Sequence, residues 1–262
     1  MWPALTRRGF LGCACCAGAV PGLAASAAAD PDWPTSLELG LPGMTRLAPS
    51  VWVTTIAPGV WLYTTTALLA PGLVFPSNGL LIEDGHQSIL IDPGTHPDQA
   101  RVLLHWAQGM GRPVCLAVST HFHSDRTGGI PAVREAGIRA VASPLTCALA
   151  RRSGQPVPAP IDGFTDGALS IRPGLELFFP GAGHTRDNIV AWLPGPRVLF
   201  GGCLLKSSTN ADLGYVADAV IADWPGSVWR VRDRYQAAAF VIPGHGTIRG
   251  DAIGRTLSLL KA

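Results

Sequence analysis

The sequence predicts an α+β fold in which two β-sheets lie inside and helices lie outside. Short apolar runs typical of strands recur in both halves of the chain, with helical segments between them. The 31 glycines and 23 prolines indicate many turns and loops, which favours a β-rich architecture over a helical bundle. At 262 residues, with 47% hydrophobic and 15% charged residues, the chain can bury a sizeable core and is not disordered.

The first half of the chain alternates predicted strands and helices. Helices are expected to begin at Pro97 and Pro131, because a proline early in a helix gives up no hydrogen bond that the helix would make. A third helix is expected over residues 144–151. The predicted strands are Val51–Ile56, Val60–Thr65, Asn78–Glu83, Ser88–Asp92 and Val114–Val118.

The second half repeats this mixture, and nothing in the sequence divides the chain by a linker or an internal repeat. Residues 30–262 are therefore expected to form a single domain, with a proline-rich extended arm over residues 30–48. Helices are predicted over residues 223–237 and 250–260. The strands predicted for this half are 168–171, 175–179, 188–193, 197–201 and Phe240–Ile242.

Residues 1–29 have the pattern of an export signal. Thr6-Arg7-Arg8-Gly9-Phe10-Leu11 matches a twin-arginine motif, and an apolar stretch and an alanine-rich cleavage region follow it. The apolar stretch is too short and too rich in Gly and Ala for a membrane anchor. A general secretory signal with two chance arginines, or a lipoprotein signal using one of the early cysteines, is the alternative. The predicted location is the periplasm.

The charge of the remaining chain argues against a nucleic-acid partner. Residues 1–29 hold two arginines and no acid, so the rest has 18 basic residues (20 − 2) against 18 acidic ones. This balance leaves no basic stripe to attract phosphates. Only Cys115, Cys147 and Cys203 remain after residue 29, which argues against a disulfide framework.

Six potential metal ligands each follow an apolar run. His121, His123 and Asp125 converge within five residues, in what we expect to be a short loop after a buried strand. The alternative for these three residues is a solvated loop with two surface histidines. Each glycine-flanked ligand further along the chain could by itself be a turn residue or a buried thiol. Together they form a nitrogen, oxygen and sulfur set suited to zinc. The later ligands are His184, Cys203 and His245, whereas His86, His96 and His105 are expected at the surface.

These residues resemble the metallo-β-lactamase superfamily and, within it, the first, di-zinc subclass of class B β-lactamases. The resemblance covers nearly all of the chain after the signal. It implies a four-layer αββα sandwich as the fold. The matching segments are Phe75–Leu80, Asp92, His121–Gly129, Gly181–Asn188, Phe200–Lys206, Asp218, Trp224-Pro225 and Gly244–Gly246.

The resemblance also assigns roles to the ligands. It implies that His121, His123 and His184 hold a first zinc and that Asp125, Cys203 and His245 hold a second. Asp92 would brace the ligand loops from behind. Many other hydrolases of the superfamily place a second-zinc histidine directly after the aspartate, where this chain has Arg126. Because Arg126 cannot bind a cation, the thiolate of Cys203 is expected to serve the second site.

The implied activity is hydrolysis of the β-lactam amide bond, which gives antibiotic resistance, by a monomer with two Zn²⁺ ions. Lys206 would attract the substrate carboxylate at the edge of the groove. Tyr215 occupies a position where many relatives have an asparagine, and its phenol could donate a hydrogen bond to the lactam carbonyl or wall the groove. Residues 64–77 are expected to form an apolar loop. That loop either covers the core or acts as a flap that contacts substrate through Leu68 and Leu69.

Two other functions remain open at this point. The first is a metal-dependent hydrolase of another lactone or thioester on the same fold. The second is an exported zinc-binding protein without catalytic activity. The sequence does not distinguish which class of β-lactam would be preferred, because the shape of the flap decides that.

Overall fold

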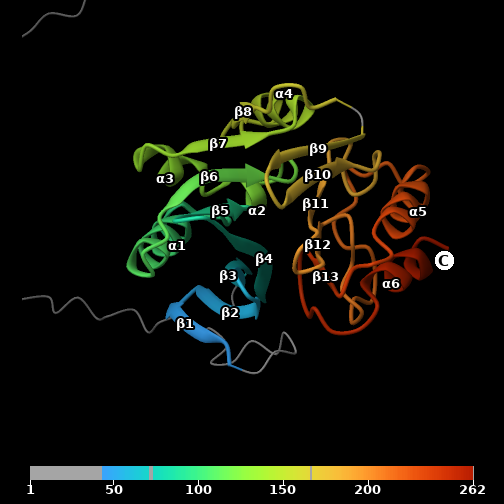
Figure 1. The fold of residues 1–262 in the computed structure, drawn as a ribbon. Helices are drawn as coiled ribbons and strands as arrows, with labels where there is room; N and C mark the ends of the chain where they lie inside the picture. Colours follow the sequence, from blue (N-terminus) through green and yellow to red (C-terminus); the bar gives the residue numbers. More distant parts are fainter. Residues whose placement is uncertain (1–42, 71–72, 166, 262) are drawn as a thin grey trace, which may run out of the picture. The chain divides into compact units, whose positions relative to one another are not determined.

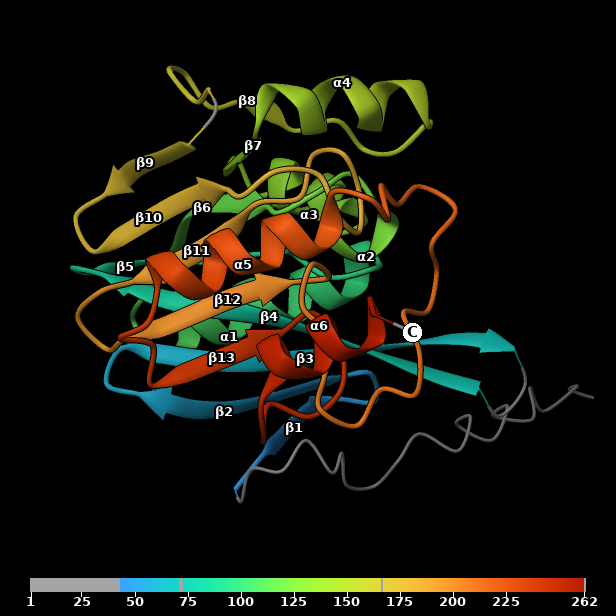
Figure 2. The same ribbon diagram turned by 90° about the vertical axis from the view of Figure 1, so that its right-hand side faces the viewer.

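The computed structural model describes residues 43–70, 73–165 and 167–261. The predicted export signal and most of the predicted extended arm therefore lie outside the described residues. Figures 1 and 2 show the described part as two β-sheets face to face, with helices on their outer sides. Among the described residues, no helix combines the length and the apolar character that crossing a membrane requires.

The first sheet follows the order of the sequence from its first to its eighth strand. Its first five strands pair antiparallel, and the pairs from the fifth to the eighth strand are parallel. The strands are β1 (Thr45–Ala48), β2 (Val51–Ala57), β3 (Val60–Ala70), β4 (Leu73–Asp84), β5 (Gln87–Ile91), β6 (Val114–Ser119), β7 (Arg139–Ala142) and β8 (Ala159–Pro160).

The second sheet has the order β13-β12-β11-β10-β9. Its β12–β13 pair is parallel and its other pairs are antiparallel. The strands are β9 (Gly167–Arg172), β10 (Leu175–Phe179), β11 (Val190–Leu193), β12 (Val198–Gly202) and β13 (Phe240–Pro243). The helices of the described chain are α1 (Pro97–Gly109), α2 (Ser124–Thr127), α3 (Ile130–Glu135), α4 (Pro144–Arg152), α5 (Trp224–Arg234) and α6 (Ala252–Leu259).

Three apolar clusters hold the layers together. The first joins α1, through the fully buried Leu103, to the outer face of the first sheet. In the second, side chains such as Val118 and Phe200 come from the two sheets and fill the space between them. The third joins the outer face of the second sheet to α5, through Val228, and to α6. The four layers therefore run helix, sheet, sheet, helix, which confirms the predicted sandwich.

The parallel strands bring the predicted ligands to one end of the sandwich. In parallel neighbours the carboxyl ends lie at the same edge of a sheet, so the loops that follow them meet there. His121 and His123 follow β6 in the first sheet, whereas Cys203 follows β12 and His245 follows β13 in the second. Both sheets thus contribute to one site at their common edge.

The apolar segment 64–77 is not a loop, and this prediction was wrong. Strand β3 continues to Ala70 and strand β4 starts at Leu73, so the segment forms a long hairpin. Pro76 pairs with Thr66 within it. The neighbouring strand β5 pairs with β4 only from Leu80 onward, so the hairpin is a two-stranded extension and no third strand requires a backbone donor from Pro76.

Four short elements were not anticipated. They are β1, which falls at the end of the predicted arm, the one-turn helix α2, and the strands β7 and β8. Asp125 lies in α2, so the ligand motif is a loop only up to His123 and then becomes helical. The other predicted strands and helices are present with boundaries shifted by a few residues.

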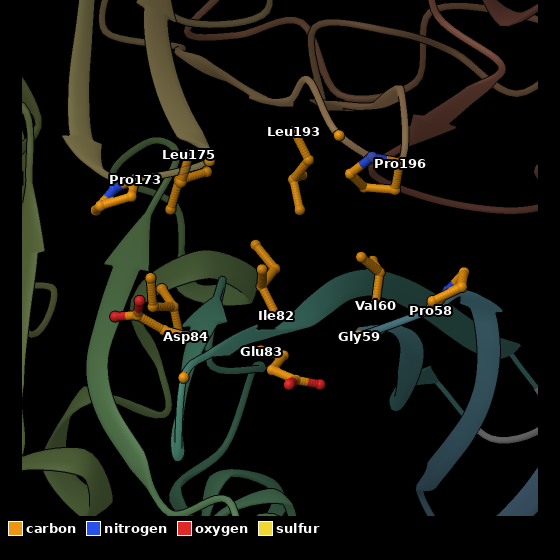
Figure 3. A pocket seen from close by; sticks show the side chains of 14 residues that line it. Pro58, Gly59, Val60, Ile82, Glu83, Asp84, Pro173, Leu175, Leu193 and Pro196 are labelled. Carbon is orange, nitrogen blue, oxygen red and sulfur yellow. The ribbon is translucent and has the colours of Figure 1, made fainter.

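A separate cleft of about 450 Å³ lies at the opposite end of the strands from the ligands (Figure 3). Four turns between antiparallel strands surround it, and three prolines, Pro58, Pro173 and Pro196, lie on its rim. Strand β12 begins beside this cleft and ends next to Cys203, which separates the two by the length of the strand. The cleft is therefore remote from the ligand site.

Candidate metal centre

The loop after β6 is held in place by Asp92, which is 1% exposed. Its Oδ1 accepts a hydrogen bond from the Thr120 backbone N at 2.7 Å, and its Oδ2 accepts one from Thr120 Oγ1 at 2.8 Å. Asp92 itself has a positive φ of 62°, and the Tyr63 hydroxyl donates to the preceding carbonyl of Ile91 at 2.6 Å. The carboxylate therefore fixes the backbone directly before His121.

His121 is fully buried, and both of its ring nitrogens lack a hydrogen-bond partner among the described residues. An imidazole buried in this way loses its hydration without gaining any protein partner, which is costly unless a cation supplies the contact. The buried Nδ1 of His184 is likewise without a partner in the part of the chain that the structure describes. These unpartnered atoms fit a metal-binding site.

The three histidines His121, His123 and His184 gather their ligand atoms within 4.8 Å of one another. His184 Nε2 lies 3.2 Å from His123 Nδ1. Two nitrogens bound to one tetrahedral zinc at about 2.0–2.1 Å are separated by roughly 3.3–3.4 Å. A direct hydrogen bond would also suit this spacing, but it would leave His121 without any partner, so a shared cation accounts for all three rings.

A second group forms around Cys203, which is 2% exposed. Its Sγ lies 3.0 Å from His245 Nε2 and 3.6 Å from Asp125 Oδ2, and these last two atoms are 3.2 Å apart. His121 also lies within 4.8 Å of Asp125 and Cys203. The two groups of ligands are therefore adjacent, and all six predicted ligands lie together.

The two groups differ in their electrostatics. Burial, reinforced by neighbouring positive groups, holds the pKa of His121 and of His184 well below the usual value, so both rings are neutral. Burial opposes protonation of His245 too, but the Cys203 sulfur and the Asp125 carboxylate raise its pKa to about 9. His121 and His184 thus offer neutral nitrogen donors to the first group, whereas the second group is rich in charge.

Arg126 is the main residue whose importance the sequence did not reveal. Its guanidinium is fully buried and donates to the Asn78 carbonyl at 2.7 Å, to Asp92 Oδ2 at 3.2 Å and to Cys203 Sγ at 2.9 Å. It also lies 3.0 Å from Asp125 Oδ2. Burial would raise the pKa of Asp125, but Arg126 and His245 outweigh it and hold that pKa well below the usual range. Arg126 therefore keeps Asp125 ionised.

The base of the β3–β4 hairpin orients His245. Its Nδ1 lies 2.8 Å from the Pro76 carbonyl, so this nitrogen is the donor and Nε2 is left for a cation. The ring of Phe75 lies over the imidazole, with the centroids 4.3 Å apart. A Cβ at Gly244 would lie 2.7 Å from Arg126 Nη2, so only glycine fits before His245.

Lys206, which was predicted to lie at the edge of the groove, is buried. Only 5% of it is exposed, and its Nζ sits 5.2 Å from the ring centroid of Trp224, in the geometry of a cation–π contact. Burial lowers the pKa of Lys206, and Cys203 and Asp125 oppose this effect. Lys206 is therefore a buried ammonium group, and its role in attracting the substrate carboxylate stays a prediction.

Tyr215 and Asp218 lie beside the first group, on the loop between Cys203 and α5. Tyr215 is 61% exposed, and its ring meets the ring of His123 edge to face at 5.5 Å. Asp218 Oδ2 lies 3.0 Å from His123 Nε2. No role was predicted for Asp218 from the sequence. Leu68 and Leu69 belong to β3 near the tip of the hairpin, and their side chains lie outside the described part of the structure.

The remaining histidines and cysteines are placed largely as expected. His86, His96 and His105 are exposed. Cys147 is buried and Cys115 is half-buried, and all three cysteines in the described ranges are free thiols.

Comparison with known proteins places this site in a family. The model of the "Metallo-beta-lactamase superfamily" matches residues 72–245, which span all six ligands. The chain belongs to this superfamily. The match confirms the family that the ligand motifs indicated. The nitrogen, oxygen and sulfur donors of the site suit a zinc-type metal.

Named relatives agree with the family match. A "Metallo-beta-lactamase type 2" of Bacillus cereus is 35% identical over 86% of this chain and 84% of its own length. The protein of the same name from Bacteroides fragilis is 32% identical over 78% of this chain and 83% of its own length. The chain thus spans most of each relative.

Solved structures share the fold. A metallo-beta-lactamase from Pontibacter korlensis has a TM-score of 0.75 and 38% identity, and the alignment covers 80% of this chain and 99% of that one. The enzyme FIM-1 from Pseudomonas aeruginosa, solved in its mono-zinc form, has a TM-score of 0.77 and 36% identity over 81% of this chain and 95% of its own.

Proposed function

We propose that this chain hydrolyses the amide bond of β-lactams with the help of zinc and so gives resistance to these antibiotics. The observation that carries the proposal is the pair of adjacent donor groups that meet at the buried, unpartnered His121. The names of the relatives from Bacillus cereus and Bacteroides fragilis support the substrate class.

We assign two zinc ions to the six ligands. His121, His123 and His184 would hold the first, because three imidazole ligands with one open position are typical of catalytic zinc. The second would lie among Asp125, Cys203 and His245, where a thiolate favours a soft cation. Zinc in a three-histidine site lowers the pKa of a bound water to about 7 and so supplies a hydroxide nucleophile at neutral pH.

The chain's own residues would bind and orient the substrate. The buried ammonium group of Lys206 is a partner for the carboxylate that most β-lactams carry, and its low exposure strengthens such a charge pair. Asp125, held ionised by Arg126, can accept a hydrogen bond from the attacking water through a carboxylate oxygen. Asp92 and Arg126 keep the loops of both groups in register.

A substrate panel tests the proposal. Nitrocefin and a carbapenem should be hydrolysed, whereas lactones and thioesters should react far more slowly. The reverse preference would identify a hydrolase of another acyl substrate on the same fold. Tight zinc binding without turnover of any compound on the panel would identify a non-catalytic zinc-binding protein.

For the cellular context, we propose export to the periplasm by the twin-arginine route and action as a monomer. The support is the Arg7-Arg8 motif and the cleavage region before residue 30. Replacing both arginines by lysine should leave the precursor in the cytoplasm, because the export receptor reads the guanidinium pair. The same exchange at Arg151 and Arg152 is the matched control. Normal processing of the Arg7/Arg8 variant would indicate another export route, and sedimentation measures the oligomeric state.

A further inference from the structure

A pocket of about 150 Å³ lies next to the loop after His184, and none of the six ligands lines it. Most of its wall is apolar and comes from Pro144 and Leu145 at the start of α4, from Phe164, and from Phe179 at the end of β10. An apolar cavity of about this volume can hold a molecule as large as benzene. The pocket is therefore large enough for a small organic group.

The pocket contains one acidic side chain, Asp187, which is 1% exposed. Neither of its carboxylate oxygens has a hydrogen-bond partner among the described residues. Asp92 is equally buried, but it accepts hydrogen bonds from Thr120 and from the Arg126 guanidinium. Burial of a carboxylate without such partners is costly, and burial raises the pKa of Asp187. Asp187 is thus a buried acceptor that lacks a donor within the described chain.

The start of α4 does not supply that donor. Pro144 has no backbone N–H, and the Thr146 backbone N donates to Ser143 Oγ at 3.0 Å. The Thr146 hydroxyl also lies 2.9 Å from Ser143 Oγ. The nearby hydroxyls of Thr146 and Thr185 oppose the rise in the pKa of Asp187, but in the described ranges neither completes a hydrogen bond with its carboxylate.

The loop around Asp187 is held in place by its neighbour Asn188. The Asn188 Oδ1 accepts from the Thr185 backbone N at 3.0 Å, and its Nδ2 donates to the Gly181 carbonyl at 2.9 Å. The Ile189 backbone N donates to the Thr120 carbonyl at 2.9 Å. These bonds keep the Asp187 backbone at the pocket wall, so a ligand would meet a preorganised carboxylate.

Two free oxygens on one carboxylate match the planar fork of a guanidinium group, which donates two parallel N–H bonds. An ammonium group offers a point charge without this fork, and water offers no charge at all. The rings of Phe164 and Phe179 suit both the face of a guanidinium and a short alkyl chain.

We propose that this pocket binds an alkylguanidinium cation, with the guanidinium on Asp187 and the alkyl group against the apolar wall. Such a group occurs in small free guanidines and in the arginine side chain of a peptide. The proposal does not depend on the hydrolysis of β-lactams, because the pocket contains no metal ligand.

The test uses matched ligands and matched variants. Ethylguanidinium is compared with ethylurea, its neutral analogue, and with propylammonium, a cation without the fork. N-acetylarginine methylamide represents the peptide source. Two-dimensional NMR of the zinc-loaded protein follows the amide signals of Leu145 and Thr165 at the pocket. A guanidinium carries no free lone pair, so binding to zinc does not complicate the titration.

We expect ethylguanidinium to bind saturably and roughly tenfold to a hundredfold more tightly than ethylurea, as hydrogen bonds to a charged group imply. Propylammonium should bind roughly several-fold more weakly than ethylguanidinium. Asp187→Asn should abolish the preference for the cation. Asp162→Asn is the matched control, because it removes a 94% exposed carboxylate two positions before Phe164, and it should leave the preference unchanged. The tighter of ethylguanidinium and the arginine derivative identifies the source.

Three results would overturn the proposal. Equal affinities for ethylguanidinium and ethylurea would make the pocket a merely apolar site. An unchanged preference in Asp187→Asn would exclude this carboxylate as the partner. Binding of ethylguanidinium that appears only after sodium salts are removed would identify a site for an inorganic cation. If Asp187→Asn does not fold, the comparison of the two ligands on the unmodified chain still decides.

Discussion

Arg126 donates a hydrogen bond from Nη2 to Cys203 Sγ across 2.9 Å, and neither residue is more than 2% exposed. The same guanidinium reaches Asp92 and the carbonyl of Asn78 in the first sheet and the carbonyl of Gly244 in the loop after β13. One cation therefore connects the ligand loops of both sheets. A chain that places a cation next to a proposed metal needs compensating negative charge, and the carboxylates of Asp125 and Asp92 supply it.

The first prediction concerns this buried cation. Arg126→Met should destabilise the metal-free protein by about 3–5 kcal/mol, because it leaves buried carboxylates without their partner. Urea unfolding of the metal-free protein measures the loss. Arg101→Met, in an exposed ion pair with Glu135, is the matched control and should change the unfolding midpoint little. Equal midpoints for the two variants would mean that Arg126 contributes no more than a surface arginine.

The second prediction concerns Cys203. Cys203→Ser should weaken the second zinc site more than the first, because a neutral hydroxyl replaces a thiolate while the three histidines are unchanged. Metal analysis and chelator competition on the purified protein measure both sites. Cys147→Ser serves as the control for losing a buried thiol elsewhere. If both zinc ions bound to Cys203→Ser as they do to the unmodified chain, the assignment of Cys203 would have to be abandoned.

The third prediction concerns Lys206. Lys206→Ala should raise KM for β-lactams by roughly tenfold to a hundredfold, since a hydrogen bond to a charged group contributes about 1.5–3 kcal/mol. The effect should depend only weakly on ionic strength, because the ammonium group is buried and salt screens buried charges poorly. Steady-state kinetics with a free acid and its ester provide the comparison. Similar losses for both substrates would show that Lys206 supports the structure and does not bind the carboxylate.

The fourth prediction concerns the hairpin tip. Leu68→Ala and Leu69→Ala should raise KM more than they lower kcat, because apolar contacts from a flap stabilise bound substrate and transition state alike. Steady-state kinetics measure the split. A fall in kcat at constant KM would instead link the hairpin to the chemical step.

The sequence predicted those parts of the fold that have strong local patterns. The run Val114–Val118 is continuous and apolar, with a β-branched valine at each end, and it became the buried strand β6. Pro97 marked the start of α1 because proline fits the first turn of a helix. The short strands β7 and β8 and the single turn of α2 have too few residues to show a period, so they were missed.

The hairpin was missed for a different reason. A proline such as Pro76 argues against a strand that has a hydrogen-bonded neighbour on each side, because proline has no backbone N–H to donate. The sequence does not reveal that β4 has only one neighbouring strand at this position. Arg126 was likewise identified only as a residue that cannot bind metal. Its partners Asn78, Cys203 and Gly244 lie 48, 77 and 118 positions away, so only the folded chain brings them together.

The account rests on zinc-dependent hydrolysis of β-lactams at the six gathered ligands, and one measurement tests it most directly. Carbapenem hydrolysis by the purified protein should be followed before EDTA treatment, after it, and after zinc is added back. We expect the activity to disappear with the chelator and to return with zinc, in proportion to the zinc rebound. Hydrolysis that persists in zinc-free protein, or full zinc binding without any hydrolysis, would contradict the account.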